Sequence, residues 1–313
     1  MSVRFVTLAI IVTLASLPIG YVVGRLAALA LRPSRGRRAS GRADLLFARG
    51  VAPTTTAIIV AFAIVLPSFL IFEPRHDGEQ VGPMLVILAA LGAMHLLLVA
   101  FRVLRIMSVS RQWAVKWMRG ATALSRGEWG LPAFRIDAGL PVVAVSGILR
   151  PRLFVDRSVI ESCSPEELAA IAAHERAHVD VFDNLRRLWI GAFEGPRSAA
   201  ARAWRQAAEE AADERAVDTS ARALDLASAL VKIARLAPHR LLDCTALSTI
   251  HDGRALEARV HHLLTLDTVE PPRRSRRFTK VAIVAALVVF ALYWTPMLGA
   301  VYALVETAVK DLH

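Results

Sequence analysis

Four long apolar runs limit what this chain can fold into. They extend over Val3–Gly24, Thr54–Phe72, Val81–Phe101 and Val281–Tyr302. Each run is long enough to cross the hydrocarbon core of a bilayer as a helix. The first could also be a signal sequence, but no small-residue cleavage site follows it, so a span is the better interpretation. The sequence therefore predicts a mainly α-helical protein with four membrane spans.

Composition supports a membrane protein. Hydrophobic residues make up 55% of the 313 residues, and the mean hydropathy is +0.46. Both values are high for a soluble protein. The net charge of +11 could indicate nucleic-acid binding, but the excess lies in clusters next to the apolar runs. We therefore expect contact with anionic lipid headgroups and no direct binding of nucleic acid.

The same basic clusters predict the orientation. They lie between the first and second runs, after the third run and before the fourth, whereas the connector 73–80 is mostly acidic. Because basic loops stay on the cytoplasmic side, both chain ends are expected outside and residues from about 102 to 280 inside. This predicts a multi-pass protein of the bacterial cytoplasmic (inner) membrane.

These features predict six segments. They are a first span (1–31), a basic cytoplasmic linker (32–53), a hairpin of the second and third spans (54–104), a cytoplasmic domain (105–278), a fourth span (279–303) and a short external tail (304–313). His95 lies within the third span, and we expect it to make a hydrogen bond between helices.

A metal-binding motif lies in the predicted cytoplasmic domain. His174-Glu175-Arg176-Ala177-His178 places two histidines four residues apart, on one face of a helix. Two imidazoles so placed can bind one zinc ion, and Glu175 can take the proton of a water that zinc activates. A pair of this kind also occurs by chance on an exposed helix, so the remaining ligands decide between the two interpretations.

The sequence before the motif favours a helix. Ser164 can cap its N-terminus, Pro165 suits the first helical position, and Glu167 completes a capping box. This helix is predicted over about Ser164–Val181, and Asp183 follows its end.

A second helix, predicted over about Arg197–Ala223, offers further acidic residues. Glu209 and Asp213 are four apart and share a face. Glu209 can supply a third zinc ligand, and Asp213 can accept the free ring N–H of a ligand histidine. Glu210 and Glu214 have the same spacing, so the residues alone leave the register open.

Two further patterns accompany the motif. Residues 133–156 are predicted to form two or three short strands separated by Gly and Pro turns. An edge of such a sheet can bind a peptide by strand addition, or the strands can be purely structural. Residues 105–126 are amphipathic. This segment is either a helix at the membrane surface or a helix that packs Trp113 and Trp117 on the domain core.

The chain resembles the membrane zinc peptidases of the β-lactam sensor-transducer family over roughly residues 1–305. The resembling features are the four spans, the segment Ser164-Pro165-Glu166-Glu167-Leu168, the motif at 174–178, Asp183 and the pair Glu209 and Asp213. The resemblance implies a gluzincin-type protease fold, zinc held by His174, His178 and Glu209, Glu175 as the catalytic base, and Asp213 beside a ligand histidine. It also favours the Glu209 register.

The resemblance implies cleavage of a cytoplasmic protein, such as a transcriptional repressor, or of the chain itself. Full members of that family carry an extracellular penicillin-binding domain after the fourth span, and this sequence ends soon after Tyr302. We therefore expect no antibiotic-acylated serine domain, and the input signal stays open. Two alternatives remain: a prenyl-processing or quality-control membrane metalloprotease, and a scaffold that has lost turnover.

Overall fold

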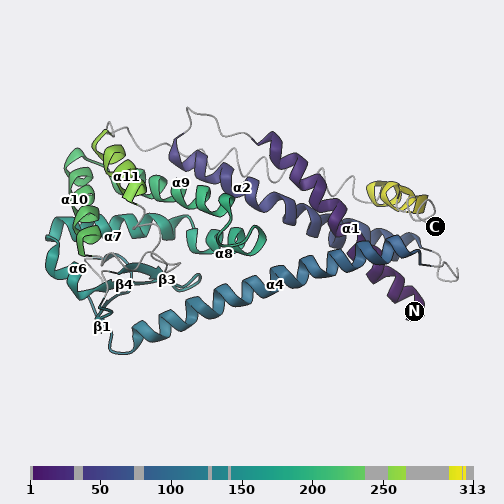
Figure 1. Ribbon diagram of the computed structural model, residues 1–313, viewed down its shortest axis with the longest axis horizontal. Coiled ribbons are helices and arrows are strands. Elements are labelled where there is room, and N and C mark those ends of the chain that lie inside the picture. The colour runs from purple at the N-terminus through teal and green to yellow at the C-terminus, as the bar shows by residue number, and fades with distance from the viewer. Residues whose placement is uncertain are drawn as a thin grey trace. The chain divides into compact units, whose positions relative to one another are not determined.

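The computed structural model describes residues 3–31, 38–73, 81–125, 129–139, 142–236, 253–265, 296–304 and 306–307. This part of the chain is mainly helical and contains one small mixed sheet (Figure 1). Contacts divide the protein into two compact units. The first comprises residues 1–32, 48–101 and 272–313, and the second comprises residues 33–47 and 102–271.

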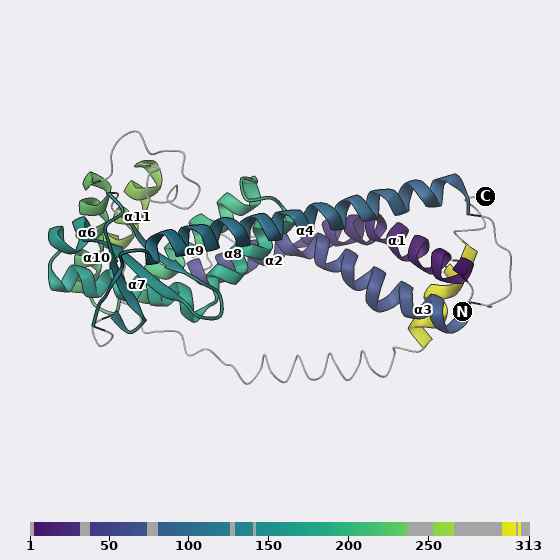
Figure 2. The same ribbon diagram turned by 90° about the horizontal axis from the view of Figure 1, so that it is seen from below.

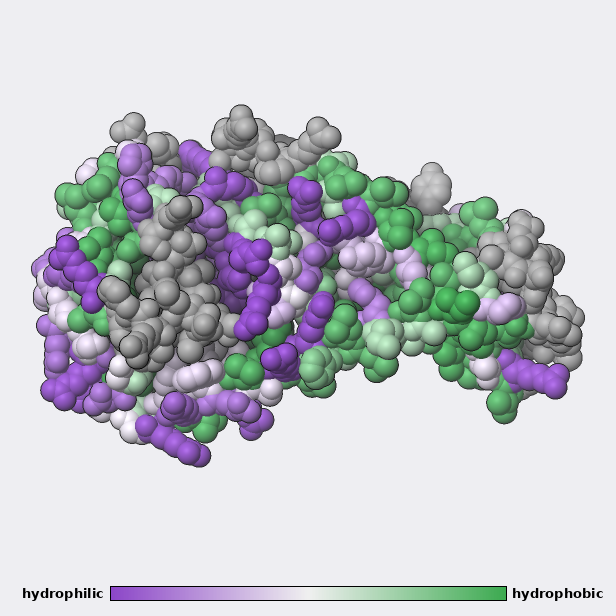
Figure 3. Space-filling view, viewed as in Figure 1, coloured by the Kyte–Doolittle hydropathy of each residue, from purple (hydrophilic) through white to green (hydrophobic). Residues whose placement is uncertain are grey.

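Three helices are long and apolar enough to cross a membrane. They are α1 (Val3–Ala30), the continuous stretch Ala39–Phe72 and α4 (Pro83–Met118). The middle one consists of α2 (Ala39–Ile58), the π-helical turns of η1 (Ile59–Val65) and α3 (Leu66–Phe72). Figure 2 shows α1 and α3 together in the first unit. Hydrophobic residues cover much of the coloured surface over α1 and the first part of α4 in Figure 3.

These helices bear out three of the four predicted spans as long apolar helices. The predicted fourth span, 279–303, lies mostly outside the described residues, of which only 296–304 belong to it and form a helix. The second helix begins at Ala39 rather than near Thr54, so most of the segment expected to be a basic linker is helical.

Close helix packing in the first unit depends on small residues. A Cβ added at Gly92 would lie 2.0 Å from the Leu14 carbonyl oxygen. Without a side chain at this position, α4 can approach the backbone of α1 closely, which is how apolar helices associate where burial from water gives no driving force. His95 makes the expected polar contact between helices, because its Nε2 lies 3.4 Å from Thr54 Oγ1.

The second unit contains the sheet. Its strands are β1 (Thr122–Ala123), β2 (Ala133–Ile136), β3 (Val143–Ser146) and β4 (Arg152–Asp156), in the order β1-β2-β4-β3. Two or three strands were predicted over 133–156, and three are present. Of these, β3 and β4 form an antiparallel hairpin, and β2 joins β4 in parallel. Consequently β3 is an edge strand of the described sheet.

The central strand β4 is buried on both faces. Leu153 and Val155 pack in the core that includes Ile171 and Ala172 of the motif helix. Phe154 packs on the opposite face, where its ring centroid lies 5.4 Å from that of Trp117. The alternation of strand side chains thus places α4 on one face of β4 and the helix that carries His174 and His178 on the other.

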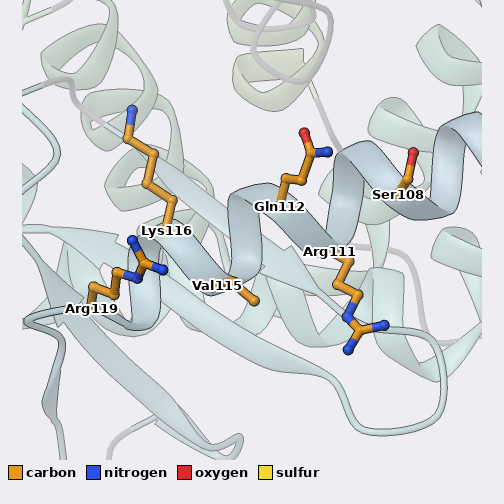
Figure 4. A pocket seen from close by; sticks show the side chains of 6 residues that line it. All are labelled: Ser108, Arg111, Gln112, Val115, Lys116 and Arg119. Carbon is orange, nitrogen blue, oxygen red and sulfur yellow. The ribbon is translucent and has the colours of Figure 1, made fainter.

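The last turns of α4 carry the predicted amphipathic pattern without a break from the apolar part of the same helix. Trp117 packs on the sheet, which agrees with the interpretation of this segment as a helix packed on the domain core. Trp113 is more exposed and lies against Trp117. A mostly polar and basic set of side chains extends from this part of the helix (Figure 4): Ser108, Arg111, Gln112, Val115, Lys116 and Arg119.

Helices complete the second unit. They are α6 (Arg157–Ser162), α7 (Pro165–Asp180), α8 (Asp183–Phe193), α9 (Ala199–Ala216), α10 (Ser220–Leu236) and α11 (Gly253–Thr265). Figure 1 shows α7 between the sheet and α9, and α7 also contacts α10. The predicted helix over 197–223 ends early, because Val217 is extended and Thr219 accepts the Arg222 N–H at the start of α10.

The start of α7 follows the predicted capping box. Ser164 accepts the Glu167 N–H, and Glu167 accepts the Ser164 N–H at 2.7 Å. The buried Glu167 carboxylate also accepts hydrogen bonds from Ser228 and Lys232 of α10. One side chain therefore both caps α7 and joins it to α10.

Candidate metal centre

Two histidines of α7 face each other across one helical turn. Their Nε2 atoms lie 3.2 Å apart, and His174 is 6% exposed. The helix also buries small side chains in the core, namely Ala170, Ala172 and Ala177. The i, i+4 spacing therefore gives the expected shared face for His174 and His178.

Glu209 of α9 completes the group. Its Oε2 lies 3.5 Å from His174 Nε2 and 3.7 Å from His178 Nε2. One donor atom from each of the three residues lies within 4.8 Å of the others, so the group could hold a metal ion. The neighbouring Glu210 instead pairs with Arg42, and Glu214 lies beside His262. The geometry thus resolves the register that the residues alone left open.

The outer ring nitrogens face two buried carboxylates. His174 Nδ1 lies 2.9 Å from Asp213 Oδ1, and His178 Nδ1 lies 2.7 Å from Asp183 Oδ2. Asp213 is 0% and Asp183 3% exposed. Asp213 was predicted beside a ligand histidine, and the structure shows that Asp183 has the matching position on the other ring.

This arrangement fits a cation. A carboxylate can only accept a hydrogen bond, so Asp183 favours a proton on His178 Nδ1. Asp213 lies almost as close to His174 Nδ1 but outside hydrogen-bond geometry, and its charge favours a proton there. Each Nε2 then presents a lone pair towards the other and towards the Glu209 carboxylate. Three donor atoms that point at one another favour a shared positive ion, and two imidazoles with one carboxylate are a usual ligand set for catalytic zinc.

The electrostatics agree with the geometry. Burial alone lowers the pKa of a histidine, yet the Glu209 and Asp183 carboxylates outweigh it and raise the pKa of His178 to about 10. The pKa of Glu209 is well below its usual value, since His178, His174 and Arg259 overcome the effect of burial. The site therefore favours positive charge among its ligand atoms, supplied by protons or by a metal ion.

Glu175 lies between the two histidines in sequence and is partly buried. Burial raises the pKa of its carboxyl above the usual value, against the opposing effect of His174 and His178. A carboxyl with a raised pKa is better matched to exchanging protons near neutral pH than an exposed one.

Arg259 of α11 is a residue of the site that the sequence did not point to. Its guanidinium donates two hydrogen bonds to Asp213, at 2.8 and 2.7 Å, and its Nη1 lies 3.2 Å from Glu209 Oε2. The side chain is 5% exposed. No spacing rule connects this arginine to the motif, and only the fold brings them together.

Arg187 of α8 is a second such residue. Its Nη2 lies 3.9 Å from Glu209 Oε1, at the edge of ion-pairing range, while its Nε is buried without a hydrogen bond. Two cations thus flank Glu209, and Arg259 is the closer and more buried one.

Comparison with known proteins identifies no family. No protein-family model matches the chain, and no curated protein matches its sequence.

Proposed function

We propose that this protein is an integral membrane zinc-dependent endopeptidase that acts in transmembrane signalling. In this proposal it belongs with the β-lactam sensor-transducer peptidases and has a gluzincin-type catalytic domain. Its substrate is a cytoplasmic protein, such as a transcriptional repressor, or the chain itself. The observation that carries the proposal is the convergence of His174, His178 and Glu209, with Glu175 next to His174 on the same helix.

The residues have distinct roles in the proposed reaction. His174, His178 and Glu209 hold zinc, which when bound polarises the scissile carbonyl and makes water more acidic. Glu175 accepts the proton of the attacking water and passes it to the leaving amine. Asp213 and Asp183 hold the two imidazoles in the tautomer that leaves Nε2 available as a ligand atom.

The proposal includes a location and a topology for the protein. We assign the protein to the bacterial cytoplasmic membrane, with the catalytic unit inside and both termini outside, because basic clusters flank the apolar helices. The basic side chains near the end of α4 suit contact with anionic headgroups (Figure 4).

Two other functions need separate tests. A prenyl-processing or quality-control metalloprotease would use the same ligands, but a deletion strain would then accumulate many membrane or lipidated proteins rather than one repressor. A scaffold without turnover would keep the helices without needing zinc. The buried carboxylate behind each histidine favours an occupied metal site over a scaffold.

The test is made with the full chain in detergent. Purified protein is expected to contain zinc and to cleave labelled casein or itself, and removal of zinc by a chelator should abolish cleavage until zinc is restored. The Glu175→Gln variant should keep its zinc and lose about 10²–10⁴-fold in rate, the usual contribution of a general base.

Glu161→Gln provides the matched control, because this exposed glutamate pairs with Arg157 one turn away on α6 and lies outside the candidate site. It should cleave at the wild-type rate. Equal activity of wild type and Glu175→Gln would reject the proposed reaction, and wild-type protein without zinc would favour the scaffold.

A further inference from the structure

A small hollow lies directly beside the proposed metal centre in the second unit. It is bounded by the turn between β3 and β4 and by the junction of α7 and α8. Its volume is about 100 Å³, which suits one side chain rather than a whole small-molecule ligand. The His178 side chain forms part of its wall, and most of the remaining lining is apolar: Val145, Ile148, Pro151, Val179 and Leu185.

Two large apolar side chains beside this hollow are unusually exposed. Leu149, at the tip of the β3–β4 turn, is 94% exposed, and Phe182, between α7 and α8, is 63% exposed. Phe182 also has a φ of 58°, a left-handed conformation that costs a non-glycine residue free energy. Exposed apolar side chains around an apolar hollow are typical of a binding site.

The adjacent strand offers backbone groups to an extended partner. Val142 accepts the Asp156 N–H, so the alternation of an antiparallel pair turns the N–H and C=O groups of Val143 and the N–H of Val145 away from β4 towards a partner. Among the described strands none pairs with this side of β3. A peptide can therefore add to β3 as a further strand.

Asn184 fixes where such an added strand ends. Its side-chain amide donates to the carbonyl oxygens of Val145 and Gly147, at 3.2 and 3.0 Å. It thereby ties the last residues of the edge strand to the first turn of α8, next to Asp183. The hollow lies at this end of β3.

We propose that the hollow binds a large apolar side chain of an extended peptide substrate that adds antiparallel to β3. In that direction the N-terminal part of the peptide lies beside the C-terminal end of β3, where the hollow is. The side chain in the hollow therefore belongs to a residue on the N-terminal side of the bond that is cleaved. Leu149 and Phe182 cover this side chain once it is bound, and Asn184 is a positioning residue for the wall. This inference rests on the proposed function for the position of the cleaved bond.

The test uses the full chain in detergent with short fluorogenic peptides that carry Leu, Phe, Ala or Asp at one position at a time. Wild type should prefer Leu or Phe over Ala at one position before the cleaved bond by about 10–100-fold in kcat/KM, the usual range for an apolar pocket. Ile148→Trp fills the hollow and should reverse this preference at that position only. Leu149→Asp should reduce it.

Leu224→Asp is the matched control, because Leu224 is a 57% exposed apolar residue on α10 that does not line the hollow. It should leave every preference unchanged. An unchanged preference in Ile148→Trp, or a preference confined to positions after the cleaved bond, would overturn the proposal.

A binding measurement separates this proposal from the proposed function. Labelled peptides are titrated against the zinc-treated Glu175→Gln protein and followed by fluorescence polarisation. Tighter binding of Leu than of Ala peptides, lost in the additional presence of Ile148→Trp, supports the hollow even if no peptide is ever cleaved. Equal binding of Leu and Ala peptides, or a Leu149→Asp change that alters only attachment to lipid vesicles, overturns it.

Discussion

Arg259 connects two carboxylates with different partners at the metal centre. It holds Asp213, which faces His174, and it also lies against Glu209, the third residue of the candidate metal-binding group. The pKa of Asp213 is lowered because Arg259 and His174 together outweigh its burial. Arg259 thus helps the two histidines to keep both acids charged inside the protein.

Removing this cation should be costly. Arg259→Met is expected to destabilise the protein by about 3–5 kcal/mol, since it leaves a buried carboxylate without its partner. Arg259→Lys keeps the charge but loses the bidentate hydrogen bond to Asp213, so it should reduce the free energy of unfolding by less. Denaturant titration in detergent, followed by tryptophan fluorescence, measures both.

Arg222→Met is the control for this prediction, because Arg222 pairs with the exposed Asp218 one turn away. Pairs of that kind contribute about 0–1 kcal/mol. A loss at Arg259 no larger than the loss at Arg222 would contradict the role assigned to it.

At the scale of secondary-structure elements, Glu167 joins the start of α7 to α10. Burial alone would raise the pKa of this carboxyl, but hydrogen bonds from Lys232, Ser228 and the Ser164 N–H together lower it below the usual value. A carboxyl with a lowered pKa in the folded state stabilises it above the unfolded pKa of about 4.3 and loses that effect as the pH falls through its folded pKa.

Glu167→Gln should therefore reduce the free energy of unfolding by about 1–3 kcal/mol at neutral pH, the usual effect on a buried charged hydrogen bond. The difference from wild type should shrink as the pH falls below about 4. Chemical unfolding at a series of pH values measures it. Glu166→Gln, one residue earlier and exposed, should change little, and an effect equal to that of Glu167→Gln would refute the account.

Local chemistry explains which elements the sequence could predict. Ser164, Pro165 and Glu167 lie within one helical turn, so the start of α7 was predictable from neighbouring residues alone. The parallel pairing of β2 with β4 was not, because it joins segments separated by β3 and depends on tertiary packing. The break between α9 and α10 had a local signal, the cap at Thr219, but the helical pattern on either side concealed it.

The candidate site divides in the same way. His174, Glu175 and His178 share one helix, and their spacing was sufficient. Glu209 needed the contact between α7 and α9 to exclude Glu210. Arg259 lies on a third helix with no periodic relation to the others, so only the folded chain could reveal it.

For the whole molecule, the testable expectation is the topology. A reporter enzyme that is active only outside the cytoplasm should be active when fused after residue 78 and inactive when fused after residue 240. The physical reason is that positive flanks remain on the cytoplasmic side. A reporter active only inside should give the opposite pattern.

A chain truncated after residue 278 supplies the control for the predicted fourth span. The truncated protein should place its C-terminus inside, whereas the full chain should place it outside. The same location for both ends would remove the fourth span from the proposed topology.

The three residues of the candidate metal-binding group come from two helices with α8 between them, and this order has a consequence during synthesis. The ribosome releases three apolar helices first, then both histidines, and only later Glu209. A partly made chain therefore lacks the carboxylate that completes the group. In the proposed enzyme, protease activity would therefore arise only after the nascent protein has reached its membrane. No active protease would be free in the cytosol during synthesis.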